Sequence, residues 1–168
     1  MIASPAVTHG VVYFPTSYGQ RLKALNAKTG TTIHDVTNKA VSFSSPAIVW
    51  NTAFYGTSDG RLQAVDMARG TIVAQFQTDG WKENAANCID ADGQIDNAKL
   101  DSDSTLDTAI VGLERMYTLG SVLSSPVVVD GIVYFGSTDG NVYALRLSQR
   151  RNASHTRCAV SGICSARV

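Results

Sequence analysis

Short runs of β-branched and aromatic residues alternate with glycine-containing turns along most of the chain, which predicts strands rather than helices. In the clearest stretch, Pro126–Val129 is a first strand, Asp130-Gly131 a two-residue hairpin turn and Ile132–Gly136 a second strand. A third strand, Asn141–Leu147, follows the turn at Asp139-Gly140. The pattern therefore predicts a small antiparallel sheet.

This arrangement occurs three times. Each copy begins at a proline, namely Pro5, Pro46 and Pro126. A pair of aromatic residues follows eight residues later, at Tyr13-Phe14, Phe54-Tyr55 and Tyr134-Phe135. The second copy adds a fourth strand, Thr71–Gln77, after Gly70. The chain is therefore an internal repeat of antiparallel sheets.

Such a sheet cannot bury both of its apolar faces alone, so neighbouring copies must stack, and radial stacking gives a β-propeller. The first two prolines are 41 residues apart, within the ~40–50 residues of a propeller blade. The next gap is 80 residues, which is one repeat plus an insertion or two repeats with one eroded. Because Gly80–Leu119 has no Ser-Pro phrase and no paired aromatics, we favour the insertion.

The predicted fold class is all-β, a partial β-propeller of about three four-stranded antiparallel blades with one inserted loop-helix segment. The expected boundaries are blade 1 at 1–40, blade 2 at 41–79, the insertion at 80–120, an incomplete blade 3 at 121–147 and a disordered tail at 148–168. The tail is assigned as disordered because it shows no repeat character and the expected fourth strand, 151–157, is polar.

The phrase from Ser124 to Leu145, Ser-Ser-Pro followed by the hairpin, an Asp-Gly turn and Tyr-Ala-Leu, resembles the pyrroloquinoline-quinone-type (PQQ-type) propeller repeat. That repeat occurs in quinoprotein dehydrogenases and in non-catalytic relatives such as the outer-membrane protein assembly lipoprotein. The resemblance implies a fold and not an activity. Quinone-holding members carry adjacent cysteines and eight blades. Neither feature is present here, so the chain resembles the non-catalytic members more closely.

The family also joins neighbouring blades with a motif, Ala-x-Asp-x-x-Thr-Gly, followed four residues later by tryptophan. Residues 24–30 and 64–70 fit its first part. His34 and Ala74 stand at the tryptophan position. The resemblance therefore implies looser docking of the blades, which further favours a scaffold.

Charge and composition exclude several classes of protein. Fourteen basic and fourteen acidic side chains cancel, so the basic surface that nucleic-acid binding requires is missing. No apolar run approaches the ~20 residues of a membrane-spanning helix, and Met1–Pro5 leads directly into strand-like sequence without a signal peptide.

The cysteines lie at 88, 158 and 164. Either the last two form a disulfide bridge or all are free thiols, and the sequence leaves both possibilities open. The histidines, at 9, 34 and 155, are scattered and indicate no catalytic site, and no cofactor is expected.

Within the insertion, Asp90, Asp92 and Asp96 match the middle of an EF-hand-type calcium loop, with Gly93 at the sharp turn. The first and last ligand positions are Cys88 and Lys99. Because the strongest oxygen donors are missing, any calcium site is expected at the weak ~10⁻³ M end of the range. The other interpretation is a solvated acidic loop.

A helix is predicted after this loop, because apolar residues recur at three- and four-residue steps. These are Leu106, Ala109, Ile110, Leu113, Met116 and Tyr117. Ser104 is a candidate N-cap, and Gly120 lies just past the end. The apolar face either packs on the blade below or recruits a partner, and we favour packing.

The sequence analysis leads to a non-enzymatic, protein-binding propeller scaffold whose partner it does not identify. The alternatives are a remnant of a PQQ-dependent dehydrogenase and a weak calcium-binding surface module. Because propellers close with ~4–8 blades, we expect a fragment of a longer exported protein, periplasmic or extracellular in its parent form. Open blade edges favour self-association.

Overall fold

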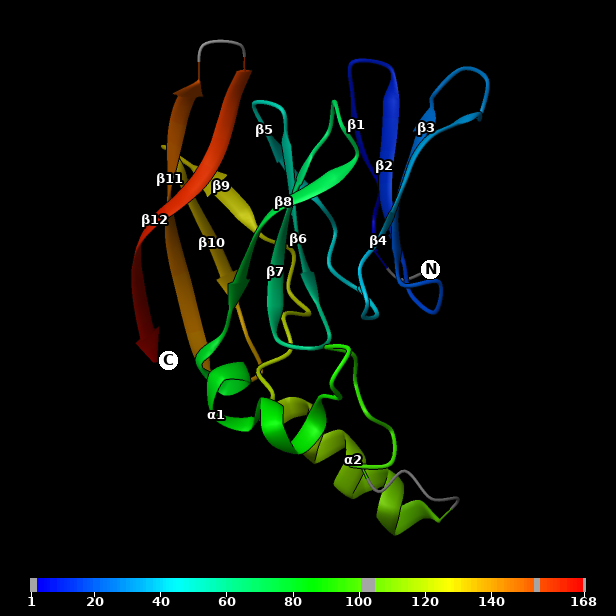
Figure 1. Cartoon of the computed structure of the whole chain (residues 1–168), viewed down its shortest axis with the longest axis vertical. Helices are drawn as coiled ribbons and strands as arrows, with labels where there is room; N and C mark the ends of the chain where they lie inside the picture. Colours follow the sequence, from blue (N-terminus) through cyan, green and yellow to red (C-terminus); the bar gives the residue numbers. More distant parts are fainter. Residues whose placement is uncertain (1–2, 101–104, 153–154, 168) are drawn as a thin grey trace.

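The computed structural model describes residues 3–100, 105–152 and 155–167, with side chains described as far as Leu147. It contains three four-stranded antiparallel sheets (Figure 1). Blade 1 consists of β1 (Ala6–Thr8), β2 (Val11–Thr16), β3 (Arg21–Asn26) and β4 (Thr32–Thr37), and blade 2 of β5 (Ala47–Val49), β6 (Thr52–Thr57), β7 (Arg61–Asp66) and β8 (Thr71–Gln77). Blade 3 consists of β9 (Val127–Val129), β10 (Ile132–Gly136), β11 (Asn141–Asn152) and β12 (His155–Arg167).

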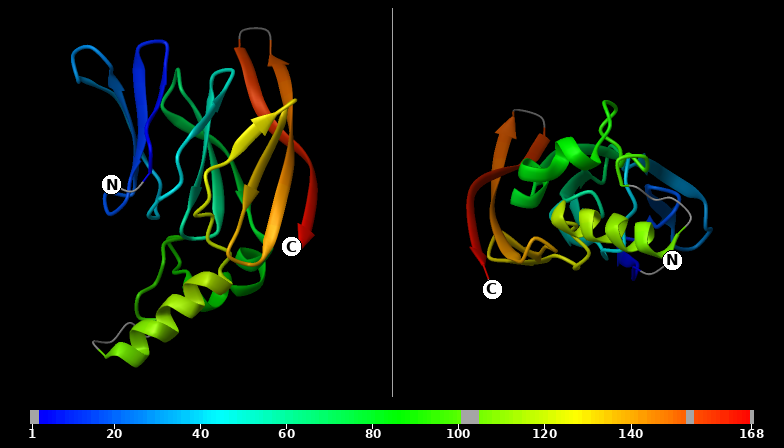
Figure 2. Two further views of the ribbon diagram at one scale, coloured as in Figure 1. Left: turned by 180° about the vertical axis from the view of Figure 1, so that it is seen from behind. Right: turned by 90° about the horizontal axis from the view of Figure 1, so that it is seen from below.

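The three blades stand side by side and face one another like the blades of a propeller (Figures 1 and 2). Two helices, α1 (Asp79–Cys88) and α2 (Leu106–Thr118), separate blade 2 from blade 3 in the sequence. They lie below the blades in Figure 1, at the end that carries the β6–β7 turn. The predicted partial propeller and the predicted insertion between the second and third repeats are therefore confirmed.

The repeats share details of backbone geometry. In blade 3 the two-residue turn between β9 and β10 places Asp130 and Gly131 at φ 48° and 72°, the left-handed conformation that this turn requires. The β3–β4 ladder shifts register between Ala24 and Leu25, and the β7–β8 ladder shifts between Ala64 and Val65. The bulge thus lies at equivalent positions of blades 1 and 2.

The prediction of an incomplete blade 3 and a disordered tail is wrong. The third strand continues to Asn152, and β12 pairs antiparallel with it from Asn152↔His155 to Asn141↔Arg167. The reason is that β11 has an open edge of backbone N–H and C=O groups, and pairing with it requires no repeat sequence in the pairing strand. The polar composition of the tail was therefore a poor guide to whether it forms a strand.

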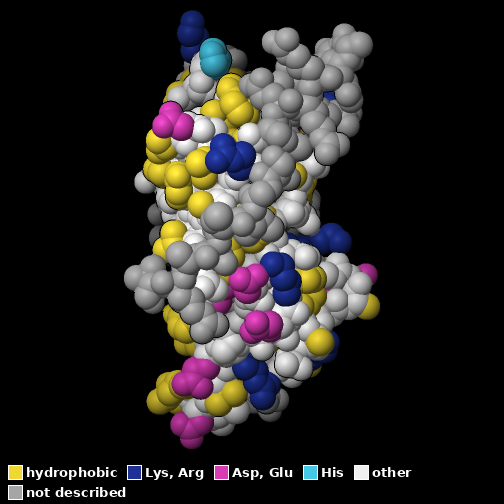
Figure 3. Space-filling view, turned by 90° about the vertical axis from the view of Figure 1, so that its left-hand side faces the viewer, with side chains coloured by type: hydrophobic (Ala, Val, Ile, Leu, Met, Phe, Trp, Pro, Cys, Tyr) yellow, Lys and Arg dark blue, Asp and Glu magenta, His cyan; other side chains and the backbone are white. Residues whose placement is uncertain are grey.

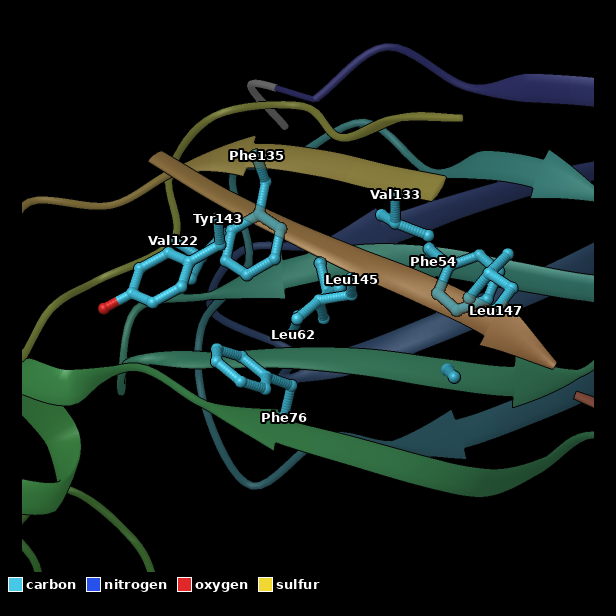
Figure 4. Packing of buried hydrophobic residues seen from close by; sticks show 10 residues of the cluster. Phe54, Leu62, Phe76, Val122, Val133, Phe135, Tyr143, Leu145 and Leu147 are labelled. Carbon is cyan, nitrogen blue, oxygen red and sulfur yellow. The ribbon is translucent and has the colours of Figure 1, made fainter. Parts of the chain in front are cut away.

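Blades 2 and 3 bury an aromatic core between them. The Phe135 and Tyr143 rings are stacked with centroids 5.2 Å apart, and Phe76 from blade 2 meets both rings edge-on, at 5.8 and 5.2 Å. Figure 4 shows these rings together with Phe54, Leu62, Val122, Val133, Leu145 and Leu147. Aromatic pairs with these geometries add to the free energy gained by burial, so this core fixes the two blades against each other.

Blades 1 and 2 share a second core. Its buried members are Tyr13, Leu22, Ala24, Val36, Ala53, Tyr55, Val65 and Met67. At its margin, His34 takes the place of the family's docking tryptophan and lies against Gly70 of blade 2, where an added Cβ would meet the His34 Nδ1 atom at 2.5 Å. An imidazole ring therefore contacts blade 2 from the position of the family's indole, and the expectation of looser docking stays a prediction.

The serine in front of each repeat proline links one blade to the next. The Ser4 backbone N–H donates to Ser45 Oγ at 2.8 Å, and the Ser45 backbone N–H donates to Ser125 Oγ at 3.0 Å. The serine hydroxyls of blades 2 and 3 thus each accept a hydrogen bond from the blade before them. We call this the serine series, and it explains why the repeat phrase contains serine at this position.

The aromatic core makes a stability prediction. Phe135→Ala should lower the free energy of unfolding by about 3–5 kcal/mol, because it removes a buried ring and leaves a cavity between two blades. Leu113→Ala on α2, where the side chain is 50% exposed, should change it by less than about 1 kcal/mol. Urea denaturation followed by circular dichroism measures both, and equal losses would contradict the packing described here.

Candidate protein-binding surface

The insertion begins with a helix that the sequence analysis missed. Thr78 is the N-cap of α1, and its side chain accepts a hydrogen bond from the Trp81 backbone N–H. Trp81, Ala85 and Cys88 recur at helical spacing and pack in one small core with Leu119. That spacing was the available signal, but the many polar residues between these positions obscured it.

Blade 3 holds the first turn of α1 through Asp139, the aspartate of its Asp-Gly turn. Asp139 Oδ2 accepts hydrogen bonds from the Gly80 backbone N–H at 3.1 Å and from the Tyr143 hydroxyl at 2.7 Å. The Tyr143 hydroxyl oxygen in turn accepts from the Asp79 backbone N–H at 2.8 Å. A carboxylate at the positive end of a helix is electrostatically favourable, so Asp139 docks the insertion onto the blade.

The charge state of Asp139 follows from these contacts. Burial alone would raise the pKa of Asp139, but hydrogen bonds from Tyr143, Gly80, Ser137 and Asn141 outweigh it and lower the pKa below its ordinary value. The ionised carboxylate is therefore the form that the fold stabilises.

Blade 2 holds the insertion through the equivalent turn aspartate and an arginine. The fully buried Asp59 carboxylate pairs with Arg61 at 3.1 Å. Arg61 also donates to the Gly93 carbonyl at 3.1 Å, and its guanidinium lies 5.4 Å from the Trp81 ring centroid. Burial raises the pKa of Asp59, and the ion pair with Arg61 and the hydrogen bond from Thr57 oppose that shift. This ion pair anchors both α1 and the loop after it.

Aspartate side chains of the acidic loop accept hydrogen bonds from the loop's own backbone N–H groups. Asp90 Oδ1 accepts from the Asp92 and Gln94 backbone N–H groups at 2.9 and 2.8 Å. Asp96 Oδ1 accepts from the Ala98 N–H at 3.0 Å, and Gly93 has the positive φ, 76°, expected at the sharp turn. Lys39 of blade 1 donates to the Asp92 carbonyl at 2.9 Å. Asp90 and Asp96 therefore stabilise turns of this loop.

Within the described ranges, no group of three or more His, Cys, Asp or Glu side chains is arranged to hold a metal. The calcium site expected over Asp90, Asp92 and Asp96 stays a prediction.

The second helix packs in an unexpected orientation. Gly112 is its buried residue, and a Cβ there would lie 3.0 Å from the Leu100 carbonyl oxygen. Leu106, Ile110, Leu113 and Tyr117 are instead 77%, 47%, 50% and 48% exposed. The favoured prediction, that the apolar face packs on the blade, is therefore wrong for most of that face. Because Gly112 has no side chain, the backbone of α2 can approach Leu100 closely. The helix therefore docks through the face that carries Gly112.

The ends of α2 fit the prediction only in part. The N-cap is Thr105, whose side chain accepts from the Thr108 N–H, while the predicted cap, Ser104, lies outside the described residues. Gly120 follows the helix with φ 75°, as expected. We call the four exposed residues, Leu106, Ile110, Leu113 and Tyr117, the α2 stripe.

A groove lies on the other side of α2. It measures about 390 Å³ and is lined in part by Tyr18, Phe43, Leu100 and Met116. Tyr18, in the β2–β3 turn of blade 1, is 95% exposed. The view from below in Figure 2 shows α2 crossing under the blades toward blade 1. The α2 stripe and this groove are thus two separate apolar surfaces on the insertion, and exposed apolar surface marks interaction sites.

His9 and His34 are the histidines whose side chains the structure describes, and they lie in different blade 1 settings. His9 is an exposed hairpin residue with φ 48°, and His34 packs against Gly70. The side chains of His155, Cys158 and Cys164 lie outside the described residues. No helix in the described ranges has the length and hydrophobicity needed to span a bilayer.

The Asp139 contacts predict a pH-dependent stability. Asp139→Asn should lower the free energy of unfolding at pH 7 by about 1–2 kcal/mol, because hydrogen bonds to a charged acceptor are lost. A folded-state pKa below the ordinary value gives stabilisation that is present above the ordinary Asp pKa and is lost as the pH falls through the folded-state value. The difference from wild type should therefore shrink below about pH 4.

Urea denaturation between pH 7 and pH 3 measures this difference. Asp130→Asn removes the same charge from the exposed β9–β10 turn and serves as the control. A loss that is independent of pH, or equal in both variants, would contradict the role of the Asp139 carboxylate.

Calorimetric titration with calcium tests the loop prediction. The calcium interpretation predicts binding at millimolar calcium that is absent in Asp92→Ala. Absence of heat in the wild-type chain would end the calcium interpretation.

Comparison with known proteins places this geometry in a family. A family model described as outer membrane protein assembly factor BamB matches residues 1–156. The outer membrane protein assembly factor BamB of Yersinia pestis is 28% identical over 151 residues, which are 87% of this chain and 31% of that protein. The chain therefore spans about a third of the length of this relative.

Solved structures agree on the fold. BamB from Moraxella catarrhalis superimposes with a TM-score of 0.55 at 17% identity, covering 86% of this chain and 34% of that one. A europium-containing methanol dehydrogenase superimposes with a TM-score of 0.56 at 15% identity, covering 85% and 30%. Likeness at this identity shows the propeller fold alone, whereas the family model covers nearly the whole chain. The chain belongs to the outer membrane protein assembly factor BamB family of PQQ-type β-propeller proteins.

Proposed function

We propose that this chain is a non-catalytic propeller scaffold that binds protein partners during assembly of the bacterial cell envelope. The observation that carries the proposal is the α2 stripe, whose four apolar side chains are between 47% and 77% exposed. Family membership supports the envelope setting, because the matching relatives are named as outer membrane protein assembly factors. By the same argument, the partner is a protein of that assembly and the compartment is the periplasmic side of the envelope.

The structure is suited to presenting this surface in a fixed position. Asp139 and the Asp59–Arg61 pair hold the insertion to blades 3 and 2, and Lys39 holds it to blade 1. An insertion held at several points loses little conformational entropy when a partner binds. The exposed side chains are leucine, isoleucine and tyrosine, which bury a large apolar area with few polar groups to desolvate.

Photo-crosslinking in a Gram-negative host tests the proposal. A photoreactive residue at Leu113 should give a discrete crosslink to a protein of the outer-membrane assembly machinery or to one of its client proteins. The same residue at Glu114, about 100° around the helix, is the control and should give little product. Crosslinks of equal yield at both positions, or none at Leu113, would contradict the proposal.

The competing interpretation is a remnant of a PQQ-dependent dehydrogenase. The similarity to methanol dehydrogenase supports a shared fold and does not support a shared activity. An alcohol-dependent dye-reduction assay with added quinone and calcium separates the two. We expect no turnover above a control without protein. Quinone-dependent turnover would overturn the non-catalytic assignment.

A further inference from the structure

Three polar side chains of blade 2 are buried with unpaired atoms. Arg61 Nε and both polar atoms of the Gln63 amide have no hydrogen-bond partner among the described residues. Asp59 Oδ2 lies 3.1 Å from Arg61 Nη1 in their ion pair but accepts no hydrogen bond within that part of the chain. On the face shown in Figure 3 the charged side chains stand at the surface, whereas Asp59, Arg61 and Gln63 are 0%, 6% and 0% exposed. Buried polar groups are normally hydrogen-bonded, so these atoms indicate a further binding partner.

Blade 3 shows how the equivalent groups are paired. The positions of the three residues are occupied there by Asp139, Asn141 and Tyr143. The Tyr143 hydroxyl donates to Asp139 Oδ2 at 2.7 Å and accepts from Asn141 Nδ2 at 3.3 Å. The same hydroxyl oxygen accepts from the Asp79 backbone N–H at 2.8 Å, and Figure 4 shows it pointing out of the aromatic core. One tyrosine hydroxyl thus joins all the polar groups of this site.

The backbones of the two sites correspond. Gln63 lies opposite Tyr55 in the β6–β7 ladder, as Tyr143 lies opposite Phe135 in the β10–β11 ladder. The turns also match. In each, the glycine N–H after the aspartate donates to the carbonyl three residues before it, at 3.3 Å in blade 2 and 3.2 Å in blade 3. The Gln63 and Tyr143 side chains therefore start from equivalent points of their blades.

The two side chains differ in length and in chemistry. Glutamine is shorter than tyrosine and has no hydroxyl, so Gln63 does not join the groups that Tyr143 joins in blade 3. The blade 2 groups at the repeat positions of the Tyr143 partners are Asp59 Oδ2 and the Arg61 side chain, and both carry unpaired atoms. The carboxylate supplies an acceptor, Arg61 Nε a donor, and the Gln63 amide can supply either. A buried water typically makes about three such hydrogen bonds.

We propose that blade 2 binds a water molecule at the place equivalent to the Tyr143 hydroxyl, between the Asp59 carboxylate, Arg61 Nε and the Gln63 amide. The water completes in blade 2 the network that a tyrosine hydroxyl completes in blade 3. Its ligands are the atoms that the protein leaves unpaired, and a water-mediated bridge is nearly as favourable in enthalpy as a direct hydrogen bond.

The position of this site gives the water a structural role. Gln63 shares its face of blade 2 with Tyr55 and Val65, which belong to the core between blades 1 and 2. Both blades that enclose the site are therefore part of the described chain. Arg61 also donates to the Gly93 carbonyl at 3.1 Å, so the water fixes the arginine that anchors the insertion.

A crystal structure of this chain, at a resolution that shows ordered waters, is the direct test. The expected result is density for one water within hydrogen-bonding distance of Asp59 Oδ2, Arg61 Nε and the Gln63 amide. A Gln63 amide bonded directly to Asp59, or a protein side chain in the place of the water, would overturn the proposal.

Oxygen-17 magnetic relaxation dispersion, which counts long-lived internal waters, tests the same site in solution. Gln63→Tyr supplies the hydroxyl of blade 3 and should remove one such water relative to the wild-type chain. Gln75 lies opposite Gln63 in the β7–β8 ladder but is exposed, so Gln75→Tyr is the matched control and should keep the wild-type number.

Equal numbers of internal waters in the wild-type chain and in a folded Gln63→Tyr variant would contradict the proposal. Circular dichroism shows whether each variant is folded. If Gln63→Tyr does not fold, the crystal structure of the wild-type chain decides between a bound water and a direct contact.

Discussion

The constraint on which the structure depends is that each blade has two apolar faces and can bury them only against neighbours. Blade 2 is the one blade of the described chain with a neighbour on both sides, and its central strands β6 and β7 are buried along almost their whole length. The two inter-blade cores differ in character. Stacked and edge-on aromatic rings fill the one toward blade 3, whereas smaller aliphatic residues and two tyrosines fill the one toward blade 1.

The insertion shows how a repeat can hold an added segment without a change in its own fold. The aspartates of the Asp-Gly turns, Asp59 and Asp139, occupy the same position in successive repeats. Asp139 binds the N-terminus of α1 directly, whereas Asp59 acts through Arg61, which reaches the loop after α1. Two equivalent turn residues thus fix two points of the insertion, and α2 is left with its apolar stripe toward solvent. This arrangement links the repeat sequence to the surface that we assign to partner binding.

Features set by local sequence were predictable, and features set by partners distant in sequence were not. The Asp130-Gly131 turn, the Thr71–Gln77 strand and the insertion between repeats follow from turn chemistry and periodicity, and the structure confirms them. The orientation of α2 depends on the contact of Gly112 with Leu100, which no periodicity reveals. Likewise, β12 pairs because β11 offers a free edge, although its own sequence lacks repeat character.

The most direct test of this account is hydrogen exchange of the central strands of this chain, measured by mass spectrometry. If burial between neighbours stabilises each blade, amides of β6 and β7 should exchange most slowly, and those of β2, β3, β10 and β11 should exchange faster. Equal protection in all three blades, or faster exchange in blade 2, would contradict the claim that the blades depend on one another for stability.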